Sequence, residues 1–148
     1  MRLTEDECRT AFARARVARL ATAGADGAPH LVPVTFAVDG EHVYFAVDAK
    51  PKTSPRLRRL RNIEENPQVS LLVDEYDEDW DRLWWVRADG HARILTAASG
   101  SESGSTVAVD DARDLLRARY PQYAHVALDG PVVEIAVDRW SGWRYAGS

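Results

Sequence analysis

The stretch HLVPVTFAVDGEHVYFAV, residues 30–47, decides the fold of this chain. Apolar and β-branched residues run over His30–Val38 and again over His42–Val47, with the tight-turn signal Asp39-Gly40 between them. The stretch therefore predicts two antiparallel strands joined as a hairpin. By the same criteria, four further strands are predicted over Val17–Thr22, Gln68–Val73, Arg82–Leu95 and Val132–Val137.

Helices are predicted between these strands. Thr4 and Glu7 have the spacing of a capping box at the start of an N-terminal helix. Ser54-Pro55 marks the start of a second helix, and Asp110–Tyr120 forms a third. Six strands with turn signals in 148 residues indicate one domain, residues 1–148, that is mainly β with flanking helices and built as an antiparallel barrel.

Composition excludes several classes of function. A net charge of −4 and a pI near 5.5 argue against binding to nucleic acid or to an anionic membrane. The single cysteine, Cys8, leaves no intrachain disulfide, and the four histidines lack the spacing of metal ligands, so we expect no metal. Without a membrane-length apolar run or a signal peptide, a cytoplasmic protein is expected. The Ser/Gly-rich segment Thr96–Thr106 is expected to be a mobile loop.

Two lysines, Lys50 and Lys52, stand out in a chain whose other basic residues are all arginines. They lie between a predicted strand and the predicted helix start at Ser54-Pro55, and Arg56 is close to the same junction, where ammonium groups and helix amides together suit a phosphate. A solvated basic turn is the alternative. Trp85 points away from Trp84 on its strand and could wall a flat ligand or fill a dimer interface. A flat ring with a phosphate tail is the ligand that this combination suggests.

Several segments together resemble a known family. Pro29–Phe36, Val43–Lys52 and Leu60–Leu71 look like the pyridoxamine-5′-phosphate-oxidase-like split β-barrels. More closely, they resemble the branch of coenzyme F420 (deazaflavin)-dependent oxidoreductases, as do Tyr76–Trp80, Arg82–Gly90 and Trp140–Trp143. The resemblance implies a six-stranded antiparallel split β-barrel (FMN-binding-like) that forms a homodimer with two cofactor sites at the subunit interface.

The resemblance also implies roles for individual residues. Lys52 falls where the family binds phosphate, with Lys50 beside it. The residues that it sets along the flavin-type ring are Pro33, Val34 and Thr35 on one strand and Phe45 and Ala46 on the next. Trp85 replaces a polar residue near the ring, and His30 replaces an arginine of the oxidase, which argues against pyridoxamine phosphate oxidase activity. Arg56, Arg58 and Arg59 could meet the acidic tail of F420.

The expected activity is transfer of a hydride from reduced F420 to a small planar conjugated substrate. Because the cofactor carries the chemistry, no catalytic side chain is expected. Three alternatives stay open: an FMN-dependent oxidoreductase on the same fold, a non-catalytic protein that binds F420 or haem, and a structural dimer without a cofactor. The physiological substrate does not follow from the sequence.

Overall fold

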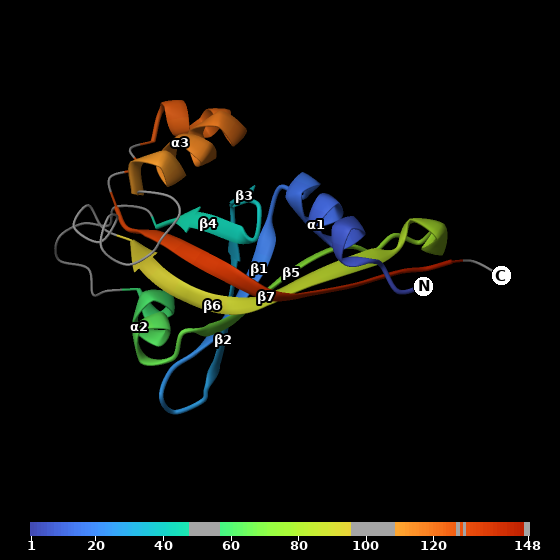
Figure 1. Cartoon of the computed structure of the whole chain (residues 1–148), viewed down its shortest axis with the longest axis horizontal. Helices are drawn as coiled ribbons and strands as arrows, with labels where there is room; N and C mark the ends of the chain where they lie inside the picture. The colour runs from blue at the N-terminus through green and yellow to red at the C-terminus, as the bar shows by residue number, and fades with distance from the viewer. Residues whose placement is uncertain (48–56, 96–108, 127, 129, 147–148) are drawn as a thin grey trace.

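The computed structural model of the protein describes residues 1–47, 57–95, 109–126, 128 and 130–146. Its α-helices are α1 (Glu5–Arg14), α2 (Arg58–Glu65) and α3 (Val109–Arg119). Its strands are β1 (Ala18–Ala23), β2 (Pro29–Val34), β3 (Ala37–Asp39), β4 (His42–Ala46), β5 (Gln68–Glu75), β6 (Trp84–Leu95) and β7 (Val132–Arg144). Short 3-10 helices lie at Trp80–Arg82 and Pro121–Ala124 (Figure 1).

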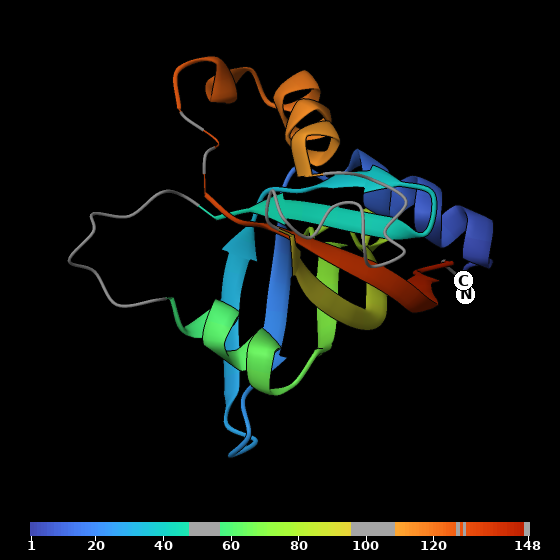
Figure 2. The ribbon, with the colours of Figure 1, turned by 60° about the vertical axis from the view of Figure 1, so that its left-hand side comes forward.

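The strands form one antiparallel sheet in the order β2-β1-β5-β6-β7-β4-β3. The sheet bends around a core to which nearly every strand contributes, for example Leu20, Phe45, Leu71, Val86 and Ile135, all fully buried (Figures 1 and 2). The predicted class, mainly β with flanking helices, is confirmed. The predicted number of six strands was wrong: within the described residues the sheet has seven, and its hydrogen-bonded ladder is open there because β2 and β3 are its two ends.

The seventh strand arises because the predicted strand His30–Val38 is broken at Thr35 and Phe36. The first half, β2, pairs with β1, whereas the second half, β3, pairs with β4 at the other end of the sheet. At the break, the Phe36 N–H donates to the Tyr120 hydroxyl at 3.1 Å, and that hydroxyl donates to the Phe36 carbonyl at 2.9 Å. A buried side chain thus binds the backbone groups that a neighbouring strand would otherwise have bound.

The predicted hairpin is confirmed where β3 and β4 pair directly. Gly40 takes a φ of 62°, a left-handed backbone conformation that glycine adopts without steric cost. The turn chemistry read from Asp39-Gly40 therefore sets this part of the register.

The long strands β6 and β7 pair along their whole length. Their register shifts between Asp89 and Gly90. At this point Asp138 of β7 has no register partner on β6 and forms a bulge. A Cβ atom on Gly90 would stand 2.2 Å from the Ala136 carbonyl oxygen, so the two backbones approach closely here. β7 runs on to Arg144, beyond the predicted end at Val137, because burial continues to alternate after the bulge.

Helix α1 begins with the predicted capping box. The Glu7 N–H donates to the Thr4 side chain at 3.2 Å, and the Thr4 N–H donates to the Glu7 carboxylate at 2.9 Å. The helix packs on β6 and β7, where the Phe12 ring meets Trp140 edge-on at a centroid distance of 5.3 Å.

Within the described residues, helix α2 begins at Arg58. Leu57 is its N-cap, and a ψ of 142° keeps that residue out of the helix while its side chain packs against the core. Ser54-Pro55 and the predicted mobile loop Thr96–Thr106 lie outside the described residues.

Helix α3 lies over β3 and β4 (Figure 2). Leu116 and Tyr120 pack there with Ala37 and Leu128. This packing brings the Tyr120 hydroxyl to the break between β2 and β3.

Candidate functional site

The outward face of β2, β1, β5 and β6 carries apolar side chains that a purely solvent-facing sheet does not need. Along β5, Leu71 is buried while Leu72 points outward and is 37% exposed; Leu31 of β2 is 67% exposed. Leu31 lies opposite Ala21 of β1, and Leu72 lies opposite Arg19, so the exposed side chains share one surface. Clustered apolar exposure of this kind marks a binding surface more often than a free one.

A hollow of about 650 Å³ lies on this face. Its lining combines leucines with aromatic and basic side chains, among them Leu31, Leu72, Tyr76, Trp85, Arg19 and Arg87. The Arg87 guanidinium lies 5.9 Å from the centre of the Trp85 ring, and its Nε donates to Asp89 at 3.0 Å. An indole wall beside a fixed guanidinium can bind a flat, electron-rich ring.

A second hollow, of about 430 Å³, adjoins the first because Trp85 and Arg87 line both. Trp143, the register partner of Trp85, and Ser141, the partner of Arg87, contribute from β7. The Ser141 Oγ is buried and has no hydrogen-bond partner among the described residues. Buried hydroxyls are ordinarily hydrogen-bonded, so this atom indicates a place for a ligand or a water molecule. We call the two hollows together the outer-face groove.

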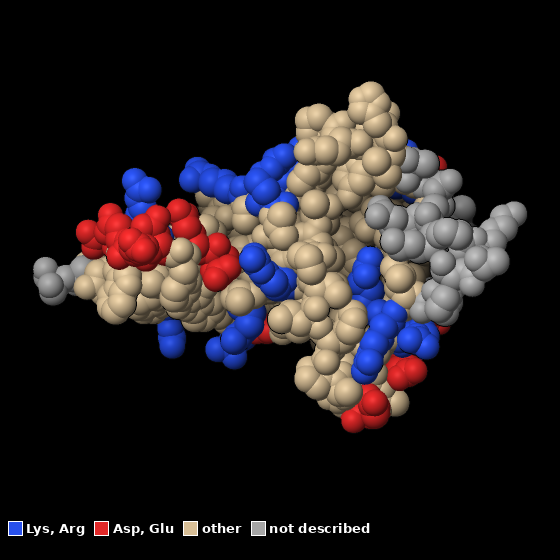
Figure 3. All heavy atoms as spheres, turned by 180° about the vertical axis from the view of Figure 1, so that it is seen from behind, with Lys and Arg blue, Asp and Glu red and all other residues tan. Residues whose placement is uncertain are grey.

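The charges of the outer-face groove differ between its two hollows: in the first, Arg19 lies 3.8 Å from Asp74 and Arg87 binds Asp89, whereas the second has arginines without such partners. Arg2 and Arg139 line its second hollow, and within the described part of the chain neither guanidinium has a carboxylate partner. Figure 3 shows one large group of acids at one end of the molecule and a smaller group elsewhere on the same face, and the exposed loop after β5 holds Asp77, Glu78, Asp79 and Asp81. The local field of the second hollow therefore favours an anionic group.

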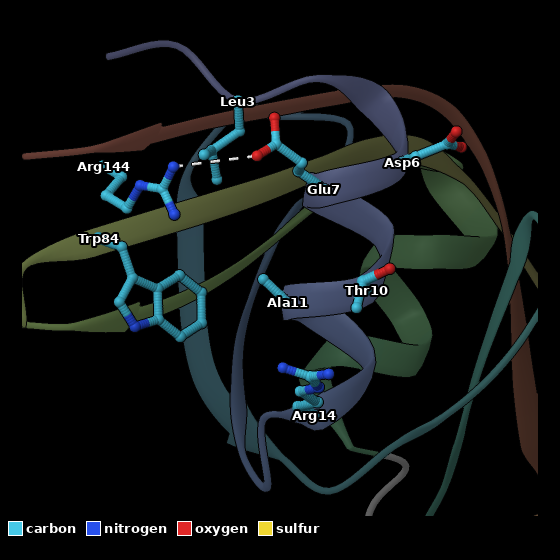
Figure 4. Close-up of a pocket in the computed structure, with 8 residues that line it drawn as sticks. All are labelled: Leu3, Asp6, Glu7, Thr10, Ala11, Arg14, Trp84 and Arg144. Atoms are coloured by element: carbon cyan, nitrogen blue, oxygen red, sulfur yellow. Dashed lines mark ion pairs between the residues drawn. The ribbon is translucent and has the colours of Figure 1, made fainter. Parts of the chain in front are cut away.

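Another hollow, of about 510 Å³, lies between α1 and the ends of β6 and β7 (Figure 4). Two of its charged groups form an ion pair: the Glu7 carboxylate accepts from the Thr4 N–H and lies 3.9 Å from Arg144. The hydrogen bond from the Thr4 backbone lowers the pKa of Glu7. Because these groups serve the start of α1, we place the candidate site in the outer-face groove.

The predicted cofactor residues that the structure describes lie on two sides of the sheet. Pro33 is exposed on the outward face, and Trp85 lies on the same face three strands away. Val34 and Phe45 point into the core, with 8% and 0% exposure. Ala46 is half-buried and packs beside α3.

Thr35 stands apart from these residues at the break between β2 and β3. Its hydroxyl lies 2.8 Å from the Tyr123 hydroxyl at the edge of a hollow of about 340 Å³. The predicted phosphate-site residues Lys50, Lys52 and Arg56 lie outside the described residues. Of the two arginines predicted to help them, Arg58 is exposed and Arg59 is half-buried in the first turn of α2.

Sequence reasoning did not single out Arg87, Ser141 or Tyr123 as site residues. The period-two alternation of β6 places Arg87 on the same face as Trp85, so the sequence pattern could have identified Arg87. Ser141 lay beyond the predicted end of the last strand, so its face could not be assigned. Tyr123 carries no local signal, because its partner Thr35 is distant in the sequence.

The described residues hold no group of three His, Cys, Asp or Glu side chains that could bind a metal ion. Cys8 of α1 is buried against β7, and this burial raises the pKa of its thiol. Among the helices described, none has the length and apolar character needed to cross a membrane.

Comparison with known proteins gives matches along almost the whole chain. The family model described as pyridoxamine 5′-phosphate oxidase matches residues 4–144. Over 57 residues, the chain is 40% identical to a 5a,11a-dehydrotetracycline/5a,11a-dehydrooxytetracycline reductase from Streptomyces rimosus. That match covers 38% of this chain and only 39% of the reductase.

Solved structures agree with the family match. An FAD-binding protein from Mesorhizobium loti superposes with a TM-score of 0.69 and 26% identity, covering 96% of this chain and 95% of that chain. The haem storage protein of Vibrio cholerae superposes with a TM-score of 0.67 over 95% of this chain and 93% of that chain. At 18% identity, this second likeness shows the fold alone.

Proposed function

The chain belongs to the pyridoxamine 5′-phosphate oxidase family, and from this premise we propose that it is an F420-dependent oxidoreductase. The family predicted from the sequence is thereby confirmed. The proposed reaction transfers a hydride to a small planar conjugated substrate. When bound, the reduced deazaflavin supplies that hydride, while the protein orients the two planes and excludes water.

The observation that carries the proposal is the outer-face groove. A deazaflavin needs a flat apolar surface for its ring and positive charge for its acidic tail. Trp85 and Leu72 offer the first, and Arg2 and Arg139 offer the second. The Ser141 hydroxyl, which has no hydrogen-bond partner among the described residues, adds a group that can bond to a ligand.

The separation of the predicted ring residues supports a homodimer. Within one chain, Pro33 and Trp85 are three strands apart, which corresponds to about 14 Å at the usual strand spacing. One flat ring therefore cannot be held between them in a single subunit. Two copies that face each other through their outward faces would bring the two surfaces together and bury Leu31 and Leu72.

The relatives support a redox function with a flavin-type cofactor. The Streptomyces protein is a reductase, and the Mesorhizobium protein binds FAD. Because the Mesorhizobium protein binds FAD, the first alternative to F420 as the cofactor is a flavin of the FMN or FAD type. Because the Vibrio cholerae protein stores haem, the second alternative is a binding protein without catalytic activity.

Fluorescence titration of the purified protein with F420 and with FMN, in parallel, tests the proposal. We expect tighter binding of F420, weakened by Lys52→Ala at the predicted phosphate site and by Arg139→Met in the groove. Arg82→Met, an exposed arginine near the acidic loop, is the matched control and should bind F420 as the native protein does.

Each outcome of the titration decides between the candidates. Preferential binding of FMN would move the protein to the flavin-dependent branch. Binding of neither compound would overturn the proposal and leave haem titration as the next experiment. Tight F420 binding without oxidation of reduced F420 by any conjugated acceptor would identify a storage protein rather than an enzyme.

A further inference from the structure

We propose that the hollow beside Thr35 is a binding site for the anionic oxygen of a small planar aromatic or conjugated compound. In taking that compound as the substrate class, the inference rests on the function proposed above. Its binding, however, is measurable without turnover. The residues that line the hollow are Arg16, Val17, Thr35, Tyr120, Gln122 and Tyr123.

This hollow lies at the end of the same outward face that carries the outer-face groove. Val17 immediately precedes β1 and Thr35 immediately follows β2, next to the register pair of Ala18 and Val34, so the hollow lies at the end of these two strands. A compound bound here would therefore lie beside the surface proposed for the cofactor ring.

Two hydroxyl groups at the hollow leave one proton available to a ligand. The Thr35 and Tyr123 oxygens lie 2.8 Å apart, and either can donate to the other. Together they carry two protons, of which their mutual hydrogen bond uses one. Neither hydroxyl has another partner among the described residues, so the second proton is free to donate to an acceptor oxygen.

Arg16, which lines the hollow, and its neighbour Arg119 both lack a carboxylate partner in the part of the chain that the structure describes. Arg16 donates to the Arg119 carbonyl at 3.0 Å, and its guanidinium lies 4.8 Å from the centre of the Tyr120 ring. Arg119 lies 4.7 Å from the centre of the Phe36 ring and donates to the Ala15 carbonyl. Burial, together with the charge of Arg16, lowers the pKa of Arg119. Two adjacent guanidinium groups without counter-charge favour an anion.

The walls of the hollow favour a flat molecule. The rings of Tyr120 and Tyr123 meet edge-on, with centroids 5.9 Å apart and planes at 83°. Val17 supplies an apolar wall and is 42% exposed. The floor is rigid, because the buried Tyr120 hydroxyl is bonded to the backbone of Arg16 and Phe36.

Fluorine NMR of 4-fluorobenzoate provides the test, with neutral 4-fluorobenzamide as its isosteric comparison. The affinities are measured with the protein alone and again with saturating F420. We expect the benzoate to bind more tightly than the amide and Arg16→Met to weaken it about tenfold, the loss of one charge-assisted hydrogen bond. Tyr123→Phe should weaken it as well.

Matched controls keep the test specific to this hollow. Arg82→Met and Tyr145→Phe remove the same groups elsewhere on the surface and should leave benzoate binding unchanged. The thermal midpoint of each variant establishes that it is folded. Equal affinity for benzoate and benzamide, the same affinity in Arg16→Met and Tyr123→Phe as in the native protein, or no binding with or without F420 would each overturn the inference.

The F420 titration separates this inference from the proposed function. Benzoate binding that depends on Arg16 and Tyr123, in a protein that does not bind F420, would support the site and overturn the function. F420 binding without benzoate binding would do the reverse.

Discussion

Replacing Tyr120 by phenylalanine should destabilise the protein by about 3 kcal/mol, because one buried hydroxyl serves three backbone groups. It accepts from the Phe36 N–H at 3.1 Å and shares its proton between the Arg16 and Phe36 carbonyls, each at 2.9 Å. Loss of the hydrogen bond that the Tyr120 hydroxyl donates costs about 1 kcal/mol. The Phe36 N–H, left unpaired in the core, costs about 2 kcal/mol more. For a chain of this size, the midpoint of thermal unfolding should fall by roughly 10 °C.

Urea unfolding followed by tryptophan fluorescence measures this loss as a shift in midpoint at constant slope. Tyr123→Phe is the control, since among the described residues its hydroxyl bonds only to half-buried Thr35, and its removal should cost less than about 1 kcal/mol. If Tyr120→Phe lost no more than this control, the hydroxyl would not hold the break between β2 and β3, and the explanation given for the seventh strand would fail.

Three further predictions concern single sites. Gly90→Ala should destabilise the protein by more than about 2 kcal/mol, because the new Cβ meets the Ala136 carbonyl oxygen at 2.2 Å; a thermal midpoint equal to that of the native protein would contradict the close approach. Cys8 should react with a disulfide reagent only after unfolding, because burial raises the pKa of its thiol; rapid reaction of the native protein would refute this. The Thr4 hydrogen bonds lower the pKa of Glu7 below its ordinary value of 4.5, so the stabilising contribution of its charge is present above pH 4.5 and is lost as the pH falls through the lower folded pKa. The stability of the native protein relative to Glu7→Gln should therefore decline on acidification in urea melts, and a difference independent of pH would exclude this contribution.

Local chemistry was enough to predict several elements. The capping box of α1 and the turn at Asp39-Gly40 each depend on residues within a few positions of one another, and both are confirmed. The alternation around Trp85 likewise placed that residue and Arg87 on one face of β6. In each case the relevant interactions lie within one element or one turn.

What the sequence could not predict depends on distant partners. The break at Thr35 and Phe36 is held by Tyr120, from beyond α3. The end of β7 was missed because the bulge at Asp138 shifts its register against β6. The unpartnered state of Ser141 is visible only when the surroundings of its hydroxyl are known. These features belong to tertiary packing, which periodicity does not encode.

The break between β2 and β3 also bears on how the protein keeps its sheet edges from aggregating. Hydrogen bonds leave the ladder open at β2 and β3, yet two residues, Thr35 and Phe36, join these edge strands covalently. In a closed barrel, hydrogen bonds would join the two edge strands. Here the backbone joins them instead, so neither edge strand can move far from the other. Cutting the backbone at this link would release two unpaired strand edges at once, and we expect the nicked protein to self-associate through them.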